Sequence, residues 1–118
     1  MKHQLNSLRR TLLVCALLSA VTLALFWPVV HHDFVNYDDN CYIDRNPQVR
    51  AGLTWQGLAW AFGQLHGDHT YWHPLTWTSH MLDCQLFGLN PAGHHLANLL
   101  FHVINTLLVF VVLRRMTG

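Results

Sequence analysis

The sequence predicts an all-α membrane protein in which two transmembrane helices are joined by an exported loop. Three observations lead to this fold class: few charged residues, two long uncharged apolar runs, and basic residues grouped at the outer ends of those runs. Of the 118 residues, 52% are hydrophobic and 11% are charged, whereas an average soluble domain has about 25% charged residues. The net charge is only +1, so no basic surface indicates a nucleic-acid-binding protein.

The first apolar run covers residues 11–30 and contains no charged side chain. At a rise of about 1.5 Å per residue, a helix of this length crosses the hydrocarbon core of a bilayer. A cleaved signal peptide is the alternative, but this run is longer than the apolar core of such a peptide and lacks a clean A-x-A site. It also ends in Phe26 and Trp27, an aromatic pair typical of the membrane interface. We therefore expect an uncleaved transmembrane helix.

The second predicted span covers residues 94–113, and residues 96–113 within it are uncharged. It is preceded by Asn90 and Pro91. Asparagine is a favoured N-cap, and proline is tolerated at the first helical position. The helix should therefore begin before the apolar run does.

The basic residues predict the orientation of the two spans. Cations flank the outer end of each run and are almost absent from the inner ends; they are Lys2, Arg9, Arg10, Arg114 and Arg115. By the positive-inside rule, residues 1–10 and 114–118 are cytoplasmic, and residues 31–93 form a periplasmic or luminal loop.

The exported loop should be packed and not a flexible linker. It holds four of the five tryptophans and has no repetitive or Ser/Gly/Pro-rich stretch. Residues 31–50 mix aromatic, Asn, Asp and Pro residues without a helical period. We expect an extended, turn-rich segment there.

Two short amphipathic helices are predicted after that segment. In residues 53–65, Thr54 is a candidate N-cap, and apolar residues recur with helical spacing at Trp55, Leu58, Ala59 and Phe62. Pro74 can open the second helix and Gly88 can stop it; the side chains that share a face are those of Leu75, Thr78, Leu82 and Leu86. We expect both helices to lie along the membrane surface.

The second span carries a polar stripe formed by His94, Asn98, His102 and Asn105. Their spacing of i, i+4, i+8 and i+11 places them on one side of the helix. Polar side chains rarely face lipid, because an unpaired polar group in hydrocarbon costs free energy. The stripe therefore predicts further helices around this span, supplied by an oligomer or by sequence outside this chain.

Asp38 and Asp39 are the strongest catalytic candidates, because they follow the first span closely. A carboxylate near the headgroups can reach a lipid-linked substrate and accept a proton from an attacking hydroxyl. In an extended chain, only one of two adjacent side chains would face the substrate. The alternative is a solvated Asx turn.

Arg45 and Arg50 are the arginines of the exported loop. A guanidinium binds phosphate through two parallel hydrogen bonds; pairing with Asp44 is the simpler alternative. Trp72 and His73 complete the candidate substrate contacts, since an aromatic ring can stack on a sugar face.

A metal site in the loop is an alternative reading. Imidazole and carboxylate groups are zinc ligands, and they gather at His66, Asp68, His69 and His73, with His80 nearby. The spacing matches no standard zinc motif, so a divalent metal is not indicated by sequence alone.

Cys41 and Cys84 both lie in the exported loop, where a disulfide could form, whereas Cys15 lies in the first apolar run. A bridge between the two would tie the Asp38–Asp39 segment to the second loop helix. Spacing alone does not show that the two thiols are close.

Several blocks of the sequence resemble one family of membrane enzymes. The blocks, in order, are FVNYDD (34–39), NPQV (46–49), GLT (52–54), WHPLTW (72–77), SHMLD (79–83), LFGL (86–89) and HHLAN (94–98). They look like the start of the bacterial relatives of the transmembrane and tetratricopeptide-repeat O-mannosyltransferases, which belong to the GT-C glycosyltransferase superfamily. The resemblance extends over residues 11–118.

This resemblance implies a multi-span enzyme of the bacterial inner membrane that takes a sugar from a polyprenyl-phosphate donor and passes it to a protein or another hydroxyl acceptor. Asp38 and Asp39 then correspond to the acidic motif of the first exported loop, one acting as the base. The loop helices would line the donor site. The polar stripe would face the remaining helices of a GT-C-type bundle.

The chain departs from that family because it stops four or five residues after the second span and shows no tetratricopeptide pattern. We expect an N-terminal fragment that is inactive alone, because positioning of donor and acceptor is a large part of such catalysis. Two alternatives are a small non-catalytic membrane protein that acts through helix packing, and a histidine-rich periplasmic metal-binding module.

Overall fold

The computed structural model describes residues 2–35, 37–63 and 72–117, and these contain helices and no strand. The elements are α1 (Lys2–Phe26), the 3-10 helix η1 (Trp27–His31), the π-helix η2 (Asn40–Asp44), α2 (Pro47–Arg50), α3 (Trp55–Gly63), α4 (Pro74–Phe87) and α5 (Pro91–Thr117). Contacts divide the chain into a spanning unit, Met1–Val29 with Leu96–Gly118, and a loop unit, Val30–His95.

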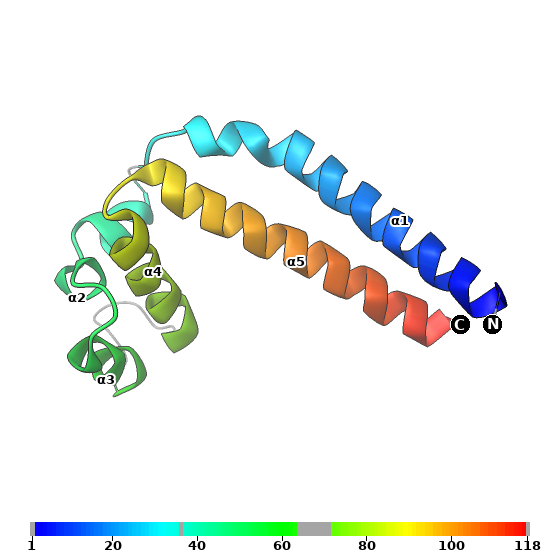
Figure 1. The fold of residues 1–118 in the computed structure, drawn as a ribbon. Coiled ribbons are helices and arrows are strands. Elements are labelled where there is room, and N and C mark those ends of the chain that lie inside the picture. The colour runs from blue at the N-terminus through cyan, green and yellow to red at the C-terminus, as the bar shows by residue number, and fades with distance from the viewer. Residues whose placement is uncertain (1, 36, 64–71, 118) are drawn as a thin grey trace. The chain divides into compact units, whose positions relative to one another are not determined.

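The spanning unit is an antiparallel pair formed by α1 and the greater part of α5 (Figure 1). Near the end of α5, Arg114 donates hydrogen bonds to the hydroxyls of Ser7, at 2.8 Å, and of Thr11. Towards the other end of the pair, the rings of Phe26 and His102 meet edge to face, with centroids 4.7 Å apart. The start of α1 and the end of α5 therefore lie together.

Two segments, Gln4–His31 and Pro91–Thr117, are long and apolar enough to cross a membrane. Their large apolar side chains are exposed, and those of Leu13 and Leu25 reach 70%. A side chain in lipid needs no protein partner, so this exposure fits a spanning helix. The predicted all-α membrane fold with two candidate spans is confirmed.

The loop unit has a small core of its own, centred on α4. The buried side chains are those of Ile43, Val49, Ala61, Trp77, Met81 and Cys84. They come from η2, α2, α3 and α4, and the partly buried rings of Phe34, Tyr42 and Trp60 pack against them. The loop between the two candidate spans is packed, as its tryptophan content predicts.

The expectation of an extended segment over residues 31–50 is wrong for its second half, which forms η2 and α2. Asn46 caps α2, because its side-chain oxygen accepts hydrogen bonds from the backbone N–H groups of Gln48, at 3.1 Å, and Val49, at 3.3 Å. Pro47 occupies the first turn. The same Asn-Pro signal precedes α5, where the Asn90 side chain accepts from the Ala92 N–H at 3.1 Å.

The two predicted amphipathic helices are present as α3 and α4, and the residues that they bury in the loop unit are mostly outside the apolar faces recognised from sequence. On α3, Thr54 caps the helix by accepting the Gly57 N–H at 2.9 Å. Gly57 and Ala61 are buried, while Trp55 is 89% exposed. Small residues let α3 approach α4 closely, since a Cβ at Gly57 would lie 3.2 Å from the Met81 sulfur.

Helix α4 shows the same arrangement. It buries Pro74, Trp77, Met81 and Cys84, spaced at helical intervals, while Leu75 is 75% exposed and Leu86 is 63% exposed. The leucine face is thus directed away from the core of the loop unit. Its placement on a membrane surface stays a prediction.

Candidate functional site

Asp38 and Asp39 lie in the turn that opens η2, so their backbone is not extended as expected. The carbonyl of Asp38 accepts the N–H groups of Cys41 and Tyr42, both at 2.9 Å. Asp39 has α-helical backbone angles, and its carboxylate accepts the Val35 N–H at 2.8 Å. Asp38 is exposed and Asp39 is half-buried, so the two carboxylates occupy different surroundings.

An aromatic stack formed by Tyr42, His73 and Trp77 lies in the same unit. The rings of Tyr42 and Trp77 are nearly parallel with centroids 4.7 Å apart. His73 stacks on Trp77 at 5.1 Å and on Tyr42 at 5.4 Å. His73 is therefore a packed ring in an aromatic environment.

Next to this stack, α4 and the start of α5 bring together His80, Asp83 and His94, which we call the imidazole–carboxylate cluster. The Nδ1 atoms of His80 and His94 lie 3.9 Å and 4.0 Å from Asp83 Oδ2. His80 also meets the Tyr42 ring edge to face, and His94 meets Phe34 in the same way. His94 is 1% exposed and Asp83 is 5% exposed.

Burial dominates the electrostatics of this cluster. It lowers the pKa of His80 below its usual value, and the charges of His94 and, to a smaller degree, His73 act in the same direction, whereas Asp39 opposes them. Burial raises the pKa of Asp83, and His94 partly offsets that rise. Both shifts favour the uncharged forms.

The other residues predicted to contact substrate are Arg45, Arg50 and Trp72. None of them has a described contact with the imidazole–carboxylate cluster. Arg45 is exposed. Arg50 donates to the backbone carbonyl of Asp44 at 3.3 Å and not to its carboxylate. Trp72 is 60% exposed, and its indole N–H donates to the Phe62 carbonyl at 3.4 Å.

The four residues considered as an alternative metal site from the sequence lie only partly within the described structure. His66, Asp68 and His69 lie outside the described residues. The fourth member, His73, belongs to the aromatic stack. Among the described histidines, cysteines and acids, the group whose ligand atoms converge is the imidazole–carboxylate cluster.

Cys41 and Cys84 are not joined in this structure. Cys41 is exposed on η2, whereas Cys84 is 7% exposed and belongs to the core of the loop unit. The structure therefore does not support a disulfide between Cys41 and Cys84, because the Cys41 side chain lies in solvent and the Cys84 side chain lies in the core. Burial is the main cause that raises the pKa of the Cys84 thiol.

The polar stripe on α5 divides into a buried first member and exposed later ones. The Nε2–H of His94 donates to the Gly88 carbonyl at 2.9 Å, and that side chain faces the core of the loop unit. Asn98, His102 and Asn105 are exposed along the helix, and His102 contacts Phe26. Whether these three face further helices stays a prediction.

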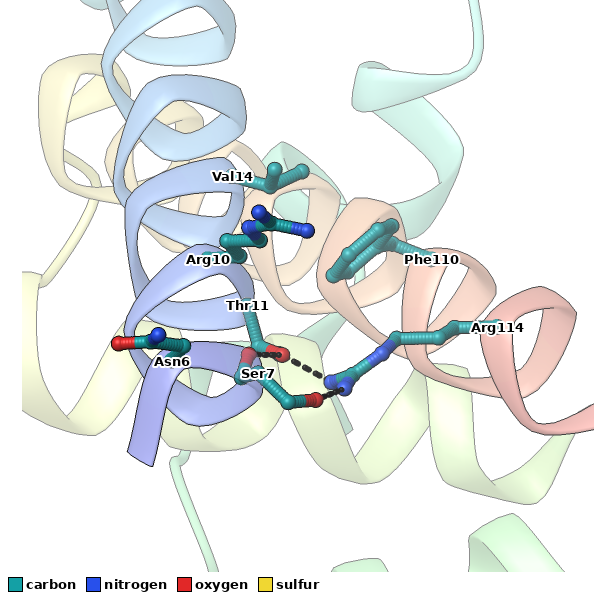
Figure 2. Close-up of a pocket in the computed structure, with 7 residues that line it drawn as sticks. All are labelled: Asn6, Ser7, Arg10, Thr11, Val14, Phe110 and Arg114. Carbon is teal, nitrogen blue, oxygen red and sulfur yellow. Dashed lines mark hydrogen bonds between the residues drawn. The ribbon is translucent and has the colours of Figure 1, made fainter. Parts of the chain in front are cut away.

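A separate hollow of about 410 Å³ lies between the outer ends of α1 and α5 (Figure 2). Its lining residues are Asn6, Ser7, Arg10, Thr11, Val14, Phe110 and Arg114. The guanidinium of Arg114 points at the hydroxyls of Ser7 and Thr11. Its hydrogen bonds therefore hold the two helix ends together.

Comparison with known proteins gives partial matches to one group. The chain is 33% identical over 101 residues, 81% of its length, to protein O-mannosyl-transferase Tmtc1 of Drosophila melanogaster. It is also 33% identical over 93 residues, 75% of its length, to protein O-mannosyl-transferase TMTC2 of Mus musculus and of Homo sapiens. The chain is therefore similar to one part of these protein O-mannosyl-transferases.

The matched region spans 12% of the Drosophila relative and 11% of the mouse and human relatives. No family profile matches the sequence, and no solved structure matches it. The similarity therefore concerns one short part of much longer proteins.

The sequence carries only part of the signal for the imidazole–carboxylate cluster. His80 and Asp83 are three residues apart on a predicted helix, a spacing that places them on one face. His94 was assigned to the membrane stripe, because the turn at Gly88 that returns it to α4 cannot be located in space from sequence.

Proposed function

We propose that this chain is part of a membrane glycosyltransferase that moves a sugar from a polyprenyl-phosphate donor to a hydroxyl group of an acceptor. The observation that carries the proposal is the 33% identity over 81% of the chain to a protein O-mannosyl-transferase. By analogy with that name, the sugar is mannose and the acceptor is a protein. The matched region is a small fraction of the relatives, so other helices must complete the enzyme.

Within this proposal, Asp38 is the better placed base. Its side chain is exposed, so it can meet the hydroxyl of an acceptor, whereas one carboxylate oxygen of Asp39 already accepts the Val35 N–H. We assign Asp39 to holding the Asp38 segment in place. A base must come within hydrogen-bond reach of the proton that it accepts.

The donor would bind beside this turn. Arg45 and Arg50 are the loop arginines suited to a lipid phosphate, and the exposed ring of Trp72 suits the face of a sugar. In this arrangement residues 31–93 face the periplasm of a bacterial cell, and both ends of the chain face the cytoplasm. The exposed side of the polar stripe would contact the remaining transmembrane helices.

The test measures sugar transfer in membranes that contain the protein made from its native locus. Membranes are incubated with polyprenyl-phosphate mannose carrying a radiolabel, and label in protein is counted. We expect Asp38→Asn to lower transfer by about 10²- to 10⁴-fold, the usual contribution of a general base. Asp39→Asn should lower it less.

Asp33→Asn is the matched control, because Asp33 is an exposed acid of the same segment with no assigned role. It should transfer sugar as the unaltered protein does. Equal amounts of each variant in the membrane are verified by immunoblot. Full transfer in both Asp38→Asn and Asp39→Asn would contradict the assignment of the acidic pair.

A further inference from the structure

We propose that the imidazole–carboxylate cluster, His80, Asp83 and His94, binds a divalent transition-metal ion, with zinc as the first candidate. This proposal does not depend on the proposed function. It rests on the convergence of three ligand atoms from two helices inside the loop unit, all within 4.8 Å of one another.

The fold holds the three side chains without help from any ligand. His80 and Asp83 are three residues apart on α4, so both point to the same side of that helix. His94 is in the first turn of α5, and the turn between the helices directs it back towards α4. The backbones of α4 and α5, together with the core of the loop unit, thus fix the relative positions of the three side chains.

The hydrogen bond of His94 determines which of its nitrogens can bind a metal. A carbonyl oxygen only accepts, so the Nε2 atom that bonds to Gly88 must carry the proton. In the neutral ring, Nδ1 then has a lone pair, and this is the atom that faces Asp83. Metal-binding histidines commonly use such a hydrogen bond from the other nitrogen to fix their tautomer.

The histidine nitrogens that face Asp83 have no hydrogen-bond partner among the described residues. The Nδ1 atoms of His80 and His94 are both buried and without a hydrogen bond. Each lies near Asp83 Oδ2, at 3.9 Å and 4.0 Å, which is too far for a hydrogen bond. The Nδ1 lone pair of His94 and the carboxylate of Asp83 face one another, with His80 Nδ1 beside them, and a cation placed among these atoms would satisfy all three.

The spacing suits a metal ion. Zinc binds imidazole nitrogen and carboxylate oxygen at about 2.0–2.2 Å, so ligand atoms in a tetrahedral site are about 3.3 Å apart. The two nitrogen-to-oxygen distances, 3.9 Å and 4.0 Å, exceed that separation by about 0.6–0.7 Å. Three protein ligands leave a fourth position for water or an anionic oxygen, as in zinc sites that perform chemistry.

The surroundings also favour a metal ion over a bridging proton alone. The rings of Phe34 and Tyr42 cover the two imidazoles, and a water-poor site strengthens charge interactions.

The test is zinc binding by the purified full chain in detergent. The protein is dialysed against micromolar ZnCl₂ with a competing chelator of known affinity, and bound zinc is measured by elemental mass spectrometry. We expect one zinc ion per chain. His80→Gln and His94→Gln should each weaken binding by more than about tenfold, since even loss of a residue behind the ligands costs that much.

Two controls separate this site from other histidines. His95→Gln removes a ring next to His94 that is outside the cluster, and it should leave the affinity unchanged. The double variant His66→Gln/His69→Gln should also leave it unchanged. Zinc that is lost in the double variant but retained in His80→Gln and His94→Gln would overturn the proposal, as would an unaltered chain that binds no stoichiometric zinc.

A second variant covers the case in which the glutamine variants fail to fold. His80→Cys keeps a metal ligand at this position. When it is loaded with Co²⁺, a thiolate in the coordination sphere gives an intense near-ultraviolet charge-transfer band that the unaltered chain lacks. A helical, Co²⁺-treated His80→Cys protein without that band would contradict coordination at position 80.

Discussion

Gly93 lies where the first turn of α5 passes the side chain of Phe87. A Cβ at this position would be 2.5 Å from the Cβ of Phe87, a separation that rotation of the Phe87 ring cannot relieve. We therefore expect Gly93→Ala to destabilise the loop unit by about 1–3 kcal/mol, the usual cost of overpacking. Thermal unfolding in detergent, followed by tryptophan fluorescence, measures the change.

Gly63→Ala is the matched control for that substitution, because nothing lies within 4 Å of a Cβ at Gly63. In a helix, alanine is ordinarily more favourable than glycine by about 1 kcal/mol. The control should thus be neutral or slightly stabilising. Equal behaviour of the two variants would show that α5 does not approach Phe87 as described.

The different exposure of Cys41 and Cys84 provides a residue-scale test of the packing of the loop unit. Cys41 is exposed, whereas Cys84 is buried and burial raises the pKa of its thiol. Because the thiolate is the reactive form, N-ethylmaleimide should modify Cys41 quickly and Cys84 at least about tenfold more slowly. Peptide mass spectrometry of timed samples gives both rates.

The same experiment distinguishes free thiols from a bridge. If Cys41 and Cys84 formed a disulfide, neither would react before reduction, and reduction would release both together. Denaturation without reductant should make Cys84 as reactive as Cys41 if both are free. Protection of Cys41 in the folded, unreduced protein would contradict the structure.

At the residue scale, short-range chemistry was predictable and long-range convergence was not. The caps at Thr54 and Asn90 were recognised because each acts on backbone groups two or three residues away. The surroundings of His94 depend on a turn six residues earlier and on two helices. Periodicity of the sequence carries no information on that geometry.

Helix α2 has only four residues, Pro47–Arg50, so its cap should matter more than it would in a long helix. Asn46→Ala removes the acceptor of two backbone N–H groups and should destabilise the loop unit by about 1 kcal/mol. Val49, which is fully buried, depends on that helix for its position. The melting temperature of the purified chain measures the loss.

Asn46→Asp is the control for the cap. Aspartate caps helices about as well as asparagine and has nearly the same shape, so this variant should melt close to the unaltered chain. A similar loss in both variants would mean that the amide N–H₂ group of Asn46 is what matters, and not the capping oxygen.

At the scale of elements, the existence of α3, α4 and α5 could be predicted, but the packed faces of α3 and α4 could not. The rule that apolar residues mark the buried face assumes that water covers the other face. In this protein Trp55 and Leu75 are exposed. The contact between α3 and α4 instead pairs Gly57 with Met81 and the ring of Trp60 with that of Trp77. Close approach of two helices depends on small residues, which an apolar count ranks low.

The whole molecule combines an antiparallel pair of apolar helices with a separately packed loop unit. The pairing of Arg114 with Ser7 and Thr11 brings the start of α1 and the end of α5 together, an arrangement consistent with the prediction that both ends lie on the same side of a membrane. The distribution of basic residues in the sequence predicts the cytoplasm.

That topology can be measured with reporter fusions in a bacterial host. Green fluorescent protein fused after Arg115 should fluoresce, because it folds in the cytoplasm, whereas alkaline phosphatase inserted near Gly67 should be active, because it needs export to form its disulfides. Exchange of the two reporters should abolish both signals.

Replacing Arg9, Arg10, Arg114 and Arg115 with glutamine removes most of the charge asymmetry and should yield mixed orientations. If the charge-depleted chain keeps a single orientation, the arginines do not set the topology. If a reporter fused after Arg115 of the unaltered chain is exported, residues 31–93 lie in the cytoplasm, together with the acidic pair and the imidazole–carboxylate cluster.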